Sequence, residues 1–330
     1  MARTGDWLIP RVNGLPRYDK PPLVYWLMGL IYALPGQPQW DPLGTWAGGL
    51  PSALSSVGLM LVMAATLLRW PQPLPSGRWP APSQQAITAV SAALAFALSP
   101  LVLLWSRIAV SDALLNGLLG AVLLQFWRCY AGGGRCWWAW ILLGLAVLTK
   151  GPVAVVLAGI TLTGFGLWQR DLRGLADRLR PWPGLGVTAL VALPWYGLAA
   201  LVEGRPFIDS FFGYHNLQRF TGVVNNHLQP WWFFLPVLVV ASLPFTPLLL
   251  QGLLASLRCR RASLPPEQSL QLFAACWLLA VLGFFTLAAT KLPSYWIPAT
   301  PAAALLVALA AQVRPPRWAR LATLALVAVL

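Results

Sequence analysis

The chain has 330 residues, of which 58% are hydrophobic and only 10% are charged, whereas about 25% of the residues of a soluble domain are charged. With a mean hydropathy of +0.66, this composition excludes a soluble enzyme, a nucleic-acid-binding module and a disordered chain, and it predicts a polytopic membrane protein. The net charge of +14 comes from positive residues scattered between apolar stretches, which indicates membrane topology and no nucleic-acid partner.

Residues 20–35 form the first apolar and aromatic segment. They contain Pro21, Pro22 and Pro35, and they are fewer than the roughly 20 residues that a spanning helix needs. Because proline interrupts helices, we expect an interfacial helix here, within an outer-face segment of residues 1–50.

Longer apolar runs follow and end at Arg, Trp, Pro or Gly clusters. The runs cover residues 51–68, 85–104, 112–127, 137–149, 153–168, 185–201, 231–251, 269–289 and 295–312, and a further run begins at residue 321. They predict an all-α bundle of about nine to ten transmembrane helices over residues 51–330, with residues 1–330 as a single transmembrane domain. We expect a further helix before Met1 and a continuation of the last run, because neither end closes the predicted topology.

Lysine and arginine are unequally distributed between alternate loops. Most arginines, among them Arg128, Arg135, Arg178 and Arg180, fall in one set of loops, and cytoplasmic loops carry the positive excess. The other set is therefore predicted to face the extracytoplasmic side of the plasma (inner) membrane. That set includes Arg107, Lys150, Arg205, Arg219 and Lys291.

None of the complete apolar runs has an ionisable residue near its middle, and Asp112 lies at the start of its run. Transporters usually place such residues at mid-membrane, so the pattern argues against transport and predicts a site at the outer surface. The chain has three lysines, Lys20, Lys150 and Lys291, and all are assigned to that side. Each alone is compatible with an interfacial lysine, but the set favours binding of an anionic phosphate.

Several short segments of the outer side contain most of its polar and charged residues. They are Gly5-Asp6-Trp7, Asp19-Lys20-Pro21-Pro22, Ser106 to Asp112, Thr149-Lys150-Gly151, His215 to Phe220, Pro230-Trp231-Trp232 and Lys291-Leu292-Pro293. Each has a purely structural alternative. Asp19 and Lys20 would be a solvated pair, Ser111 or Asp112 a helix N-cap, Lys150-Gly151 a helix break, and His215 a structural histidine.

Taken together and in this order, these segments resemble the polyprenyl-phosphate-sugar glycosyltransferases of the GT-C superfamily. The resemblance is to the transferases that add aminoarabinose to lipid A and, more distantly, to the protein mannosyltransferases. It implies a GT-C-type helix bundle that transfers a sugar from a polyprenyl-phosphate donor to a lipid, protein or glycan acceptor at the outer face. The donor, the acceptor and membrane lipids are the expected partners.

The resemblance also implies roles for individual residues. Lys20 would contact the lipid phosphate, with the further cations Lys150, Arg219 and Lys291 as helpers, since fixed cations stabilise the charge on a departing phosphate. Asp112 would belong to the catalytic cavity, where an alcohol acceptor needs a carboxylate base. Asp19 and His215 would hold a divalent metal, and no organic cofactor is expected.

Two departures from the family pattern are visible. Family members carry an Asp-Glu pair shortly before the Gly-Asp-Trp segment, and this chain begins after that position. Asn216 stands where the aminoarabinose transferases have a metal-binding histidine, and His215 is one position earlier. If the acidic pair supplies the base, this chain alone would be inactive. A transporter or flippase of lipid-linked glycans and a noncatalytic fragment of the fold therefore remain alternative functions.

Overall fold

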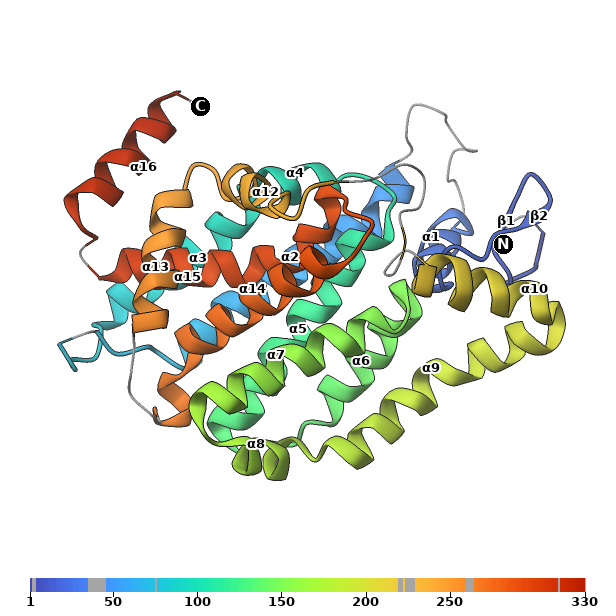
Figure 1. Ribbon diagram of the computed structural model, residues 1–330, viewed down its shortest axis with the longest axis horizontal. Coiled ribbons are helices and arrows are strands. Elements are labelled where there is room, and N and C mark those ends of the chain that lie inside the picture. Colours follow the sequence, from blue (N-terminus) through green and yellow to red (C-terminus); the bar gives the residue numbers. More distant parts are fainter. Residues whose placement is uncertain are drawn as a thin grey trace.

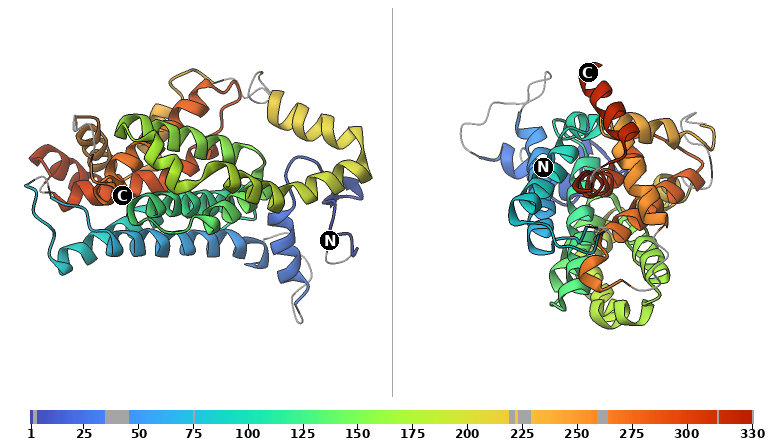
Figure 2. Two further views of the ribbon diagram at one scale, coloured as in Figure 1. Left: turned by 90° about the horizontal axis from the view of Figure 1, so that it is seen from below. Right: turned by 90° about the vertical axis from the view of Figure 1, so that its left-hand side faces the viewer.

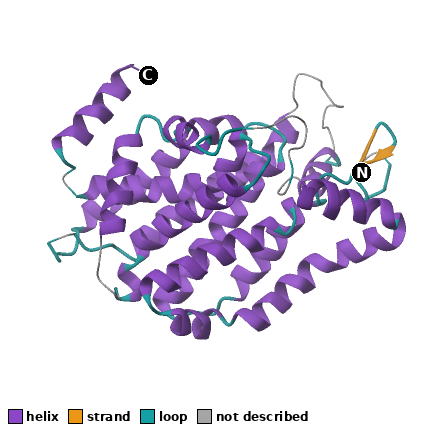
Figure 3. Ribbon diagram, in the orientation of Figure 1, coloured by secondary structure: helices purple, strands orange, loops and turns teal. Residues whose placement is uncertain are grey.

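Figure 1 shows the computed structural model, which describes residues 1, 4–34, 46–74, 76–218, 222, 229–258, 264–313 and 315–329, with the backbone alone for 215–217 and 329. In this part of the chain the strands are limited to one small antiparallel hairpin, β1 (Arg11–Val12) and β2 (Leu15–Pro16). Figure 3 shows it beside the N-terminus, with helices making up most of the molecule. The predicted all-α, GT-C-type bundle is confirmed.

The helices follow one another with short connections. They are α1 (Leu23–Tyr32), α2 (Trp46–Arg69), α3 (Pro82–Ala97), α4 (Pro100–Trp105), α5 (Ser111–Gly132), α6 (Trp137–Lys150), α7 (Val153–Gln169), α8 (Leu172–Leu179), α9 (Pro181–Glu203), α10 (Arg205–Ile208), the π-helix η1 (Asp209–Gln218), α12 (Phe234–Ala241), α13 (Thr246–Arg258), the 3₁₀ helix η2 (Pro266–Gln268), α14 (Leu270–Leu287), the 3₁₀ helix η3 (Pro293–Ala299), α15 (Thr300–Gln312) and α16 (Arg317–Val329).

Every apolar run of the sequence coincides with helical structure. Of the described helices, four are long and apolar enough to cross a membrane: α2, α9, α14 and η3 with α15. The run at 231–251 differs from a single straight span, because α12 and α13 meet at an angle of 116°. Leucines of α9 such as Leu190 and Leu201 are exposed, as expected for a helix that faces lipid. The chain is an integral membrane protein.

Small residues allow α5 to pack closely against α2, and α6 against α9. A Cβ atom on Gly117 would lie 2.8 Å from the carbonyl oxygen of Ser55 in α2. Similarly, a Cβ on Gly144 of α6 would lie 3.1 Å from the carbonyl oxygen of Thr188 in α9. Such close backbone approach is how membrane helices gain packing energy, and it fixes α5 and α6 relative to their neighbours.

The helices α5 and α6 form an antiparallel hairpin. Gly133, with φ of +68°, ends α5 in the left-handed conformation, which glycine adopts without steric cost. The chain then reverses into α6. As a result, the start of α5 lies at the same end of the hairpin as the last residue of α6, and this arrangement brings together two distant parts of the sequence.

The N-terminal segment lies at this end of the bundle. Figure 2 shows α1 crossing steeply to the direction of α2. With ten residues and a rise of 1.5 Å per residue, α1 is about 15 Å long, too short to cross a bilayer. Its predicted interfacial position and the outer-face assignment of residues 1–50 stay predictions.

Candidate functional site

Asp112 lies in the first turn of α5, but it does not cap the helix. The N-cap residue is Val110, which has an extended backbone and no side-chain capping bond. The carboxylate of Asp112 instead accepts a hydrogen bond from Lys150 Nζ. The capping alternative is therefore wrong, because the carboxylate forms an ion pair between helices.

Lys150 is the last residue of α6, and its position depends on the helix break that follows. Gly151 has a φ of +87° and Pro152 begins the turn into α7, so the sequence Lys-Gly-Pro ends α6 with the lysine at its tip. The ammonium group lies 5.1 Å from the ring centroid of Tyr295 in η3, a cation–π contact. The helix break at Gly151 and Pro152 is therefore what places Lys150 at the end of α6, beside Asp112.

The Lys150–Asp112 pair is largely shielded from water. The side chains are 20% and 13% exposed, respectively. A charge that loses most of its hydration is stable only when it is paired. The geometry therefore makes each of these two residues dependent on the other.

Lys20 completes a cluster of three charges. Burial lowers the pKa of Lys20, and the nearby charge of Asp112 opposes this effect while that of Lys150 adds to it. Lys20, in the segment before α1, is hence close enough to the pair for the three charges to interact. We call Lys20, Asp112 and Lys150 the lysine–aspartate cluster, and its two cations and one carboxylate leave a net positive charge suited to a phosphate.

Other polar side chains of α5 lie close to Asp112 in sequence. Ser111 Oγ and Asn116 Oδ1 are buried without a hydrogen-bond partner among the described residues. Asn116 Nδ2 donates to Thr300 Oγ1 at 3.2 Å. An unpaired buried polar atom costs about 1–3 kcal/mol, so these two atoms mark a place where a bound ligand or water would be favourable.

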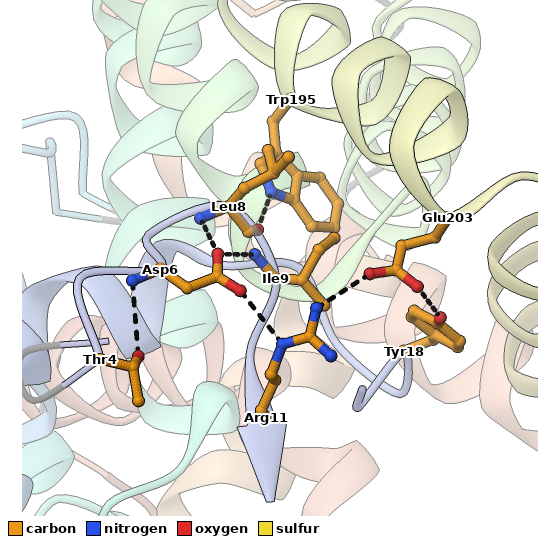
Figure 4. A network of polar contacts seen from close by, with 8 residues as sticks. All are labelled: Thr4, Asp6, Leu8, Ile9, Arg11, Tyr18, Trp195 and Glu203. Carbon is orange, nitrogen blue, oxygen red and sulfur yellow. Dashed lines mark hydrogen bonds and ion pairs between the residues drawn. The ribbon is translucent and has the colours of Figure 1, made fainter. Parts of the chain in front are cut away.

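The segment that carries Lys20 is attached to the end of α9 by an ionic network (Figure 4). Arg11 Nη2 lies 3.3 Å from Glu203 Oε1, and Arg11 Nε lies 3.1 Å from Asp6 Oδ2. Tyr18 donates its hydroxyl proton to Glu203 Oε2 at 2.5 Å. We call Asp6, Arg11, Tyr18 and Glu203 the N-terminal anchor.

Backbone contacts strengthen the anchor. Asp6 Oδ1 accepts from the backbone N–H groups of Leu8 and Ile9 at 3.1 and 3.2 Å. Trp195 Nε1 of α9 donates to the carbonyl oxygen of Leu8 at 2.8 Å, and Trp26 Nε1 of α1 donates to that of Trp7 at 2.6 Å. The Gly5-Asp6-Trp7 segment therefore has a positioning role, since it holds the chain that leads to Lys20.

The anchor shifts the pKa values of two of its members. Burial and, next to it, the hydrogen bond to Glu203 together raise the pKa of Tyr18 to about 12. For Asp6, burial acts to raise the pKa, but the hydrogen bonds from Arg11, Ile9 and Leu8 together lower it below its ordinary value. Both shifts favour the hydrogen-bonded forms, with Tyr18 neutral and Asp6 charged.

Asp19 is engaged by Arg17. Arg17 Nε and Nη2 donate to the two carboxylate oxygens at 2.7 and 2.8 Å, which is the two-bond geometry that arginine favours. The described residues contain no group of three His, Cys, Asp or Glu side chains able to hold a metal ion. The side chain of His215 and the whole of Arg219 lie outside the described residues, so the metal site and the role of Arg219 stay predictions.

The contacts described for Lys291 do not involve the lysine–aspartate cluster. Its side chain is buried, with 7% of the residue exposed, and Nζ donates to the carbonyl oxygen of Ala288 at 2.8 Å. This contact satisfies a carbonyl at the C-terminal end of α14, where a cation is favourable. No contact described in the structure joins Lys291 to Lys20 or Lys150, and its predicted phosphate role stays a prediction.

Sequence reasoning missed Glu203, Arg11, Tyr18 and Tyr295. Glu203 was visible only as a charged residue at the end of an apolar run. Tyr295 directly follows the Lys291-Leu292-Pro293-Ser294 segment, which was the one available signal. Glu203 lies far in sequence from Arg11 and Tyr18, as Lys150 does from Tyr295, so spacing alone could not have paired them.

Known proteins resemble this chain along nearly its whole length. No protein-family model matches it. The undecaprenyl phosphate-alpha-4-amino-4-deoxy-L-arabinose arabinosyl transferase of Pseudomonas aeruginosa (strain UCBPP-PA14) is 33% identical over 315 residues, which cover 93% of this chain and 52% of that protein. An uncharacterized protein of Aquifex aeolicus is 31% identical over 93% of this chain and 64% of its own length.

A solved structure agrees with these relatives. The crystal structure of ArnT from Cupriavidus metallidurans bound to undecaprenyl phosphate matches all of this chain and 56% of that chain, with a TM-score of 0.83 and 27% identity. The apo form of the same protein matches 94% of this chain with a TM-score of 0.77.

Fold and sequence together identify the chain as a relative of the GT-C polyprenyl-phosphate-sugar glycosyltransferases. Within that class, it is homologous to the aminoarabinose transferases named ArnT. The predicted resemblance is confirmed. The chain spans about half the length of these relatives, 52% of the Pseudomonas protein and 56% of the Cupriavidus chain.

Proposed function

We propose that the chain works as a membrane glycosyltransferase, which moves a sugar from a polyprenyl-phosphate donor to an acceptor. The observation that carries the proposal is the lysine–aspartate cluster, in which two cations and one carboxylate from separate segments meet at one end of the α5–α6 hairpin. The relatives support this chemistry, since one of them was crystallised with undecaprenyl phosphate. The site lies on helices and on an anchored segment, as a pre-organised site requires.

The cations of the cluster suit the leaving group. In the transfer, the bond between the anomeric carbon and the phosphate oxygen breaks, and its electron pair stays on the phosphate. Lys20 and Lys150 are placed to stabilise the charge that develops there. Lys20 is already partly desolvated, which strengthens its attraction to a bound anion because water screens it less.

Asp112 is the residue proposed to accept the proton. The acceptor oxygen forms its bond to the anomeric carbon, and the proton of that oxygen passes to the carboxylate. Asp112 is paired with Lys150, and a phosphate bound beside Lys150 would compete for the same ammonium group. Donor binding would thereby weaken the pair and make the carboxylate available as a base.

The orientation in the membrane is part of the proposal. We place the lysine–aspartate cluster at the extracytoplasmic side of the inner membrane. The arginines Arg135, Arg178 and Arg180 lie near the other end of the hairpin, where the positive-inside rule predicts the cytoplasm. Labelling of single cysteines placed near Lys20 and near Arg135 in intact cells, with a reagent that does not cross the membrane, would test this orientation.

The central experiment measures sugar transfer by the purified chain in proteoliposomes. Undecaprenyl-phosphate aminoarabinose serves as donor, lipid A as acceptor, and the released undecaprenyl phosphate is quantified. We expect transfer by the wild type, a loss of at least tenfold in Lys20→Gln, and no change in the matched variant Arg135→Gln, which lies away from the cluster. Full activity of Lys20→Gln would contradict the assignment of the phosphate site.

The two alternative functions give different results in the same preparation. A flippase would move a labelled lipid-linked glycan across the bilayer without forming a product. A noncatalytic member of the fold would bind undecaprenyl phosphate without transfer or translocation. Other acceptors, a protein or a glycan, are tested by substitution for lipid A.

A divalent metal at Asp19 and His215 is a separate proposal. The ion pair between Asp19 and Arg17 means that a metal would have to compete with a guanidinium for the carboxylate. Removal of divalent ions with EDTA would abolish transfer if the metal is required. Unchanged transfer after removal would assign Asp19 to positioning through Arg17.

A further inference from the structure

A polar cavity of about 400 Å³ lies at the other end of the α5–α6 hairpin. Its lining includes Arg135 from the turn between the two helices, and Asp177, Arg178 and Arg180 from α8 and its end. The 22 residues of α5 span about 33 Å at 1.5 Å per residue. The cavity is therefore roughly one helix length away from the lysine–aspartate cluster. Figure 1 shows α8 at the lower edge of the helix bundle.

No carboxylate among the described residues forms an ion pair with the arginines of the cavity. The ion pairs between described residues involve Arg11, Arg17 and Lys150 alone. Arg178 Nη1 donates to the backbone carbonyl of Tyr130, and its guanidinium lies 5.2 Å from the ring of Tyr130. Three cations face one acidic residue, Asp177, so the cavity has an excess of positive charge.

The backbone around the cavity is held in a fixed shape. Arg180 ends α8 in the left-handed conformation with φ of 50°, which is unfavourable for a residue with a Cβ atom. The start of α8 is fixed because Asp171 caps Gly174 N at 3.0 Å and accepts the Tyr130 hydroxyl at 2.9 Å. Strained residues persist where the surrounding structure fixes them, and they concentrate at functional sites.

A second, apolar cavity adjoins the polar one. Its volume is about 280 Å³, and it shares Trp140 and Leu179 with the lining of the polar cavity. The rest of its lining comes from α5 to α9 and includes Phe126, Leu143 and Leu162. A charged cavity and an apolar cavity side by side match an amphipathic ligand with an anionic head and a hydrocarbon chain.

Exposed tryptophans indicate the depth of the polar cavity in the membrane. Trp137 lines it, and the neighbouring Trp138 and Trp182 are 69% and 83% exposed. Tryptophans of this kind gather at the level of the lipid headgroups. A ligand that enters here would therefore come from the headgroup layer.

We propose that this pair of cavities binds one anionic phospholipid. The phosphate lies against Arg135, Arg178 and Arg180, where guanidinium groups can form paired hydrogen bonds to its oxygens. One acyl chain occupies the apolar cavity beyond Trp140 and Leu179. Basic pockets between membrane helices recognise anionic headgroups in this way. The site is separate from the lysine–aspartate cluster and does not depend on the proposed transfer reaction.

Native mass spectrometry of the purified chain tests the proposal. The protein in detergent is titrated with phosphatidylglycerol and, separately, with phosphatidylcholine of the same acyl chains. We expect one phosphatidylglycerol to be retained at concentrations at which phosphatidylcholine is not. The double variant Arg135→Gln/Arg180→Gln should bind it about thirty-fold more weakly, the factor expected for the loss of two arginines beside an anionic lipid.

The matched control is Arg170→Gln/Arg173→Gln, which removes the same charge from the same region, although neither residue lines the polar or the apolar cavity. It should bind phosphatidylglycerol as the wild type does. Equal retention of both lipids, or equal weakening in the control, would overturn the proposal. If the double variant does not fold, the single variant Arg135→Gln, which changes an exposed residue in a turn, carries the same test with a smaller loss.

Inorganic phosphate distinguishes a lipid from a free anion. Thermal unfolding is followed with added phosphate and with added phosphatidylglycerol. A rise of the unfolding temperature with phosphatidylglycerol alone supports the lipid site. An equal rise with inorganic phosphate would show that the arginines bind a free phosphate, and the lipid assignment would be wrong.

Discussion

The two ends of the α5–α6 hairpin differ in how their charged side chains are exposed and paired. At one end, Asp112 and Lys150 are largely buried and paired with each other. At the other end, Arg135 and Arg180 are exposed and have no carboxylate partner among the described residues. Shielded charges must be paired within the protein, whereas exposed cations at a membrane surface can be paired by an external anion.

The difference in charge pairing distinguishes the lysine–aspartate cluster from the arginine-lined cavity. A buried pair beside Lys20 is a pre-organised arrangement, in which a small displacement changes the chemistry. An open arginine-lined cavity tolerates variation, because water and lipid headgroups can compensate for a lost charge. Substitutions at the paired end should thus have large effects and those at the open end small ones, apart from lipid binding.

The largest effect is expected for Asp112→Asn. The substitution keeps the size of the side chain but removes the proposed base, so the rate of sugar transfer should fall by roughly 10²–10⁴-fold. The initial rate of undecaprenyl phosphate release in proteoliposomes is the measurement. A rate within twofold of the wild type would show that Asp112 is not the base.

The free energy of unfolding of the Lys150→Met variant tests the importance of the buried Lys150–Asp112 pair. It leaves the Asp112 carboxylate shielded and unpaired, which should reduce the free energy of unfolding by about 3 kcal/mol. The double variant Asp112→Asn/Lys150→Met should regain most of this loss, because the shielded carboxylate without its ammonium partner is gone. Unfolding in a denaturant titration in detergent micelles compares the two, and equal instability of both would rule out the pairing as the cause.

The N-terminal anchor predicts a moderate, pH-dependent effect. The pKa of Tyr18 is raised from 10.0 to about 12, so the folded state favours the neutral phenol. The contribution of Tyr18 to stability is therefore complete below pH 10 and is lost as the pH rises toward 12.

The unfolding temperature, measured between pH 10 and 12, checks this prediction. Tyr18→Phe lacks the ionisable hydroxyl, so its stability should fall less steeply with pH than that of the wild type. Tyr130→Phe is a useful comparison, because the pKa of Tyr130 is also raised to about 12 but its hydroxyl contacts Asp171, away from the anchor. Identical pH profiles for wild type and Tyr18→Phe would contradict the role of Tyr18 in the anchor.

The smallest effect is expected at the open end. Without added anionic lipid, Arg135→Gln should change the free energy of unfolding by less than about 0.5 kcal/mol, as for other exposed residues without a specific partner. Denaturant titration beside Lys150→Met measures the contrast directly. A loss as large as that of Lys150→Met would mean that Arg135 is held by a structural contact and that the two ends are alike.

The fold was largely predictable from the sequence, because the apolar runs are long and separated by clear breaks. The run at 112–127 became α5, and Lys150-Gly151-Pro152 ended α6 as a helix break. The bend between α12 and α13 was not predicted, although Pro244 and Pro247 lie within the run at 231–251 and mark the place of the break. Hydropathy reports which residues prefer lipid, but it carries no information about the direction of the helix axis.

The candidate site was predictable only in part. Lys20, Lys150 and Asp112 were identified as chemistry-bearing residues from their types and their places between apolar runs. Their proximity could not be predicted, because it depends on how α5 and α6 pack against each other and against α2 and α9, where Gly117 and Gly144 allow close approach. Lys291 has the same residue type, yet its ammonium group binds a helix-end carbonyl.

The sequence by itself therefore determined the membrane class, the approximate helices and the family resemblance, since all three depend on composition and on local order along the chain. Only the tertiary structure decided that Asp112 pairs with Lys150, that Arg11 and Tyr18 hold Glu203, and that arginines from two segments line one cavity. Contacts between residues tens of positions apart depend on how helices pack, and a shielded charge takes as its partner the opposite charge that this packing brings within reach.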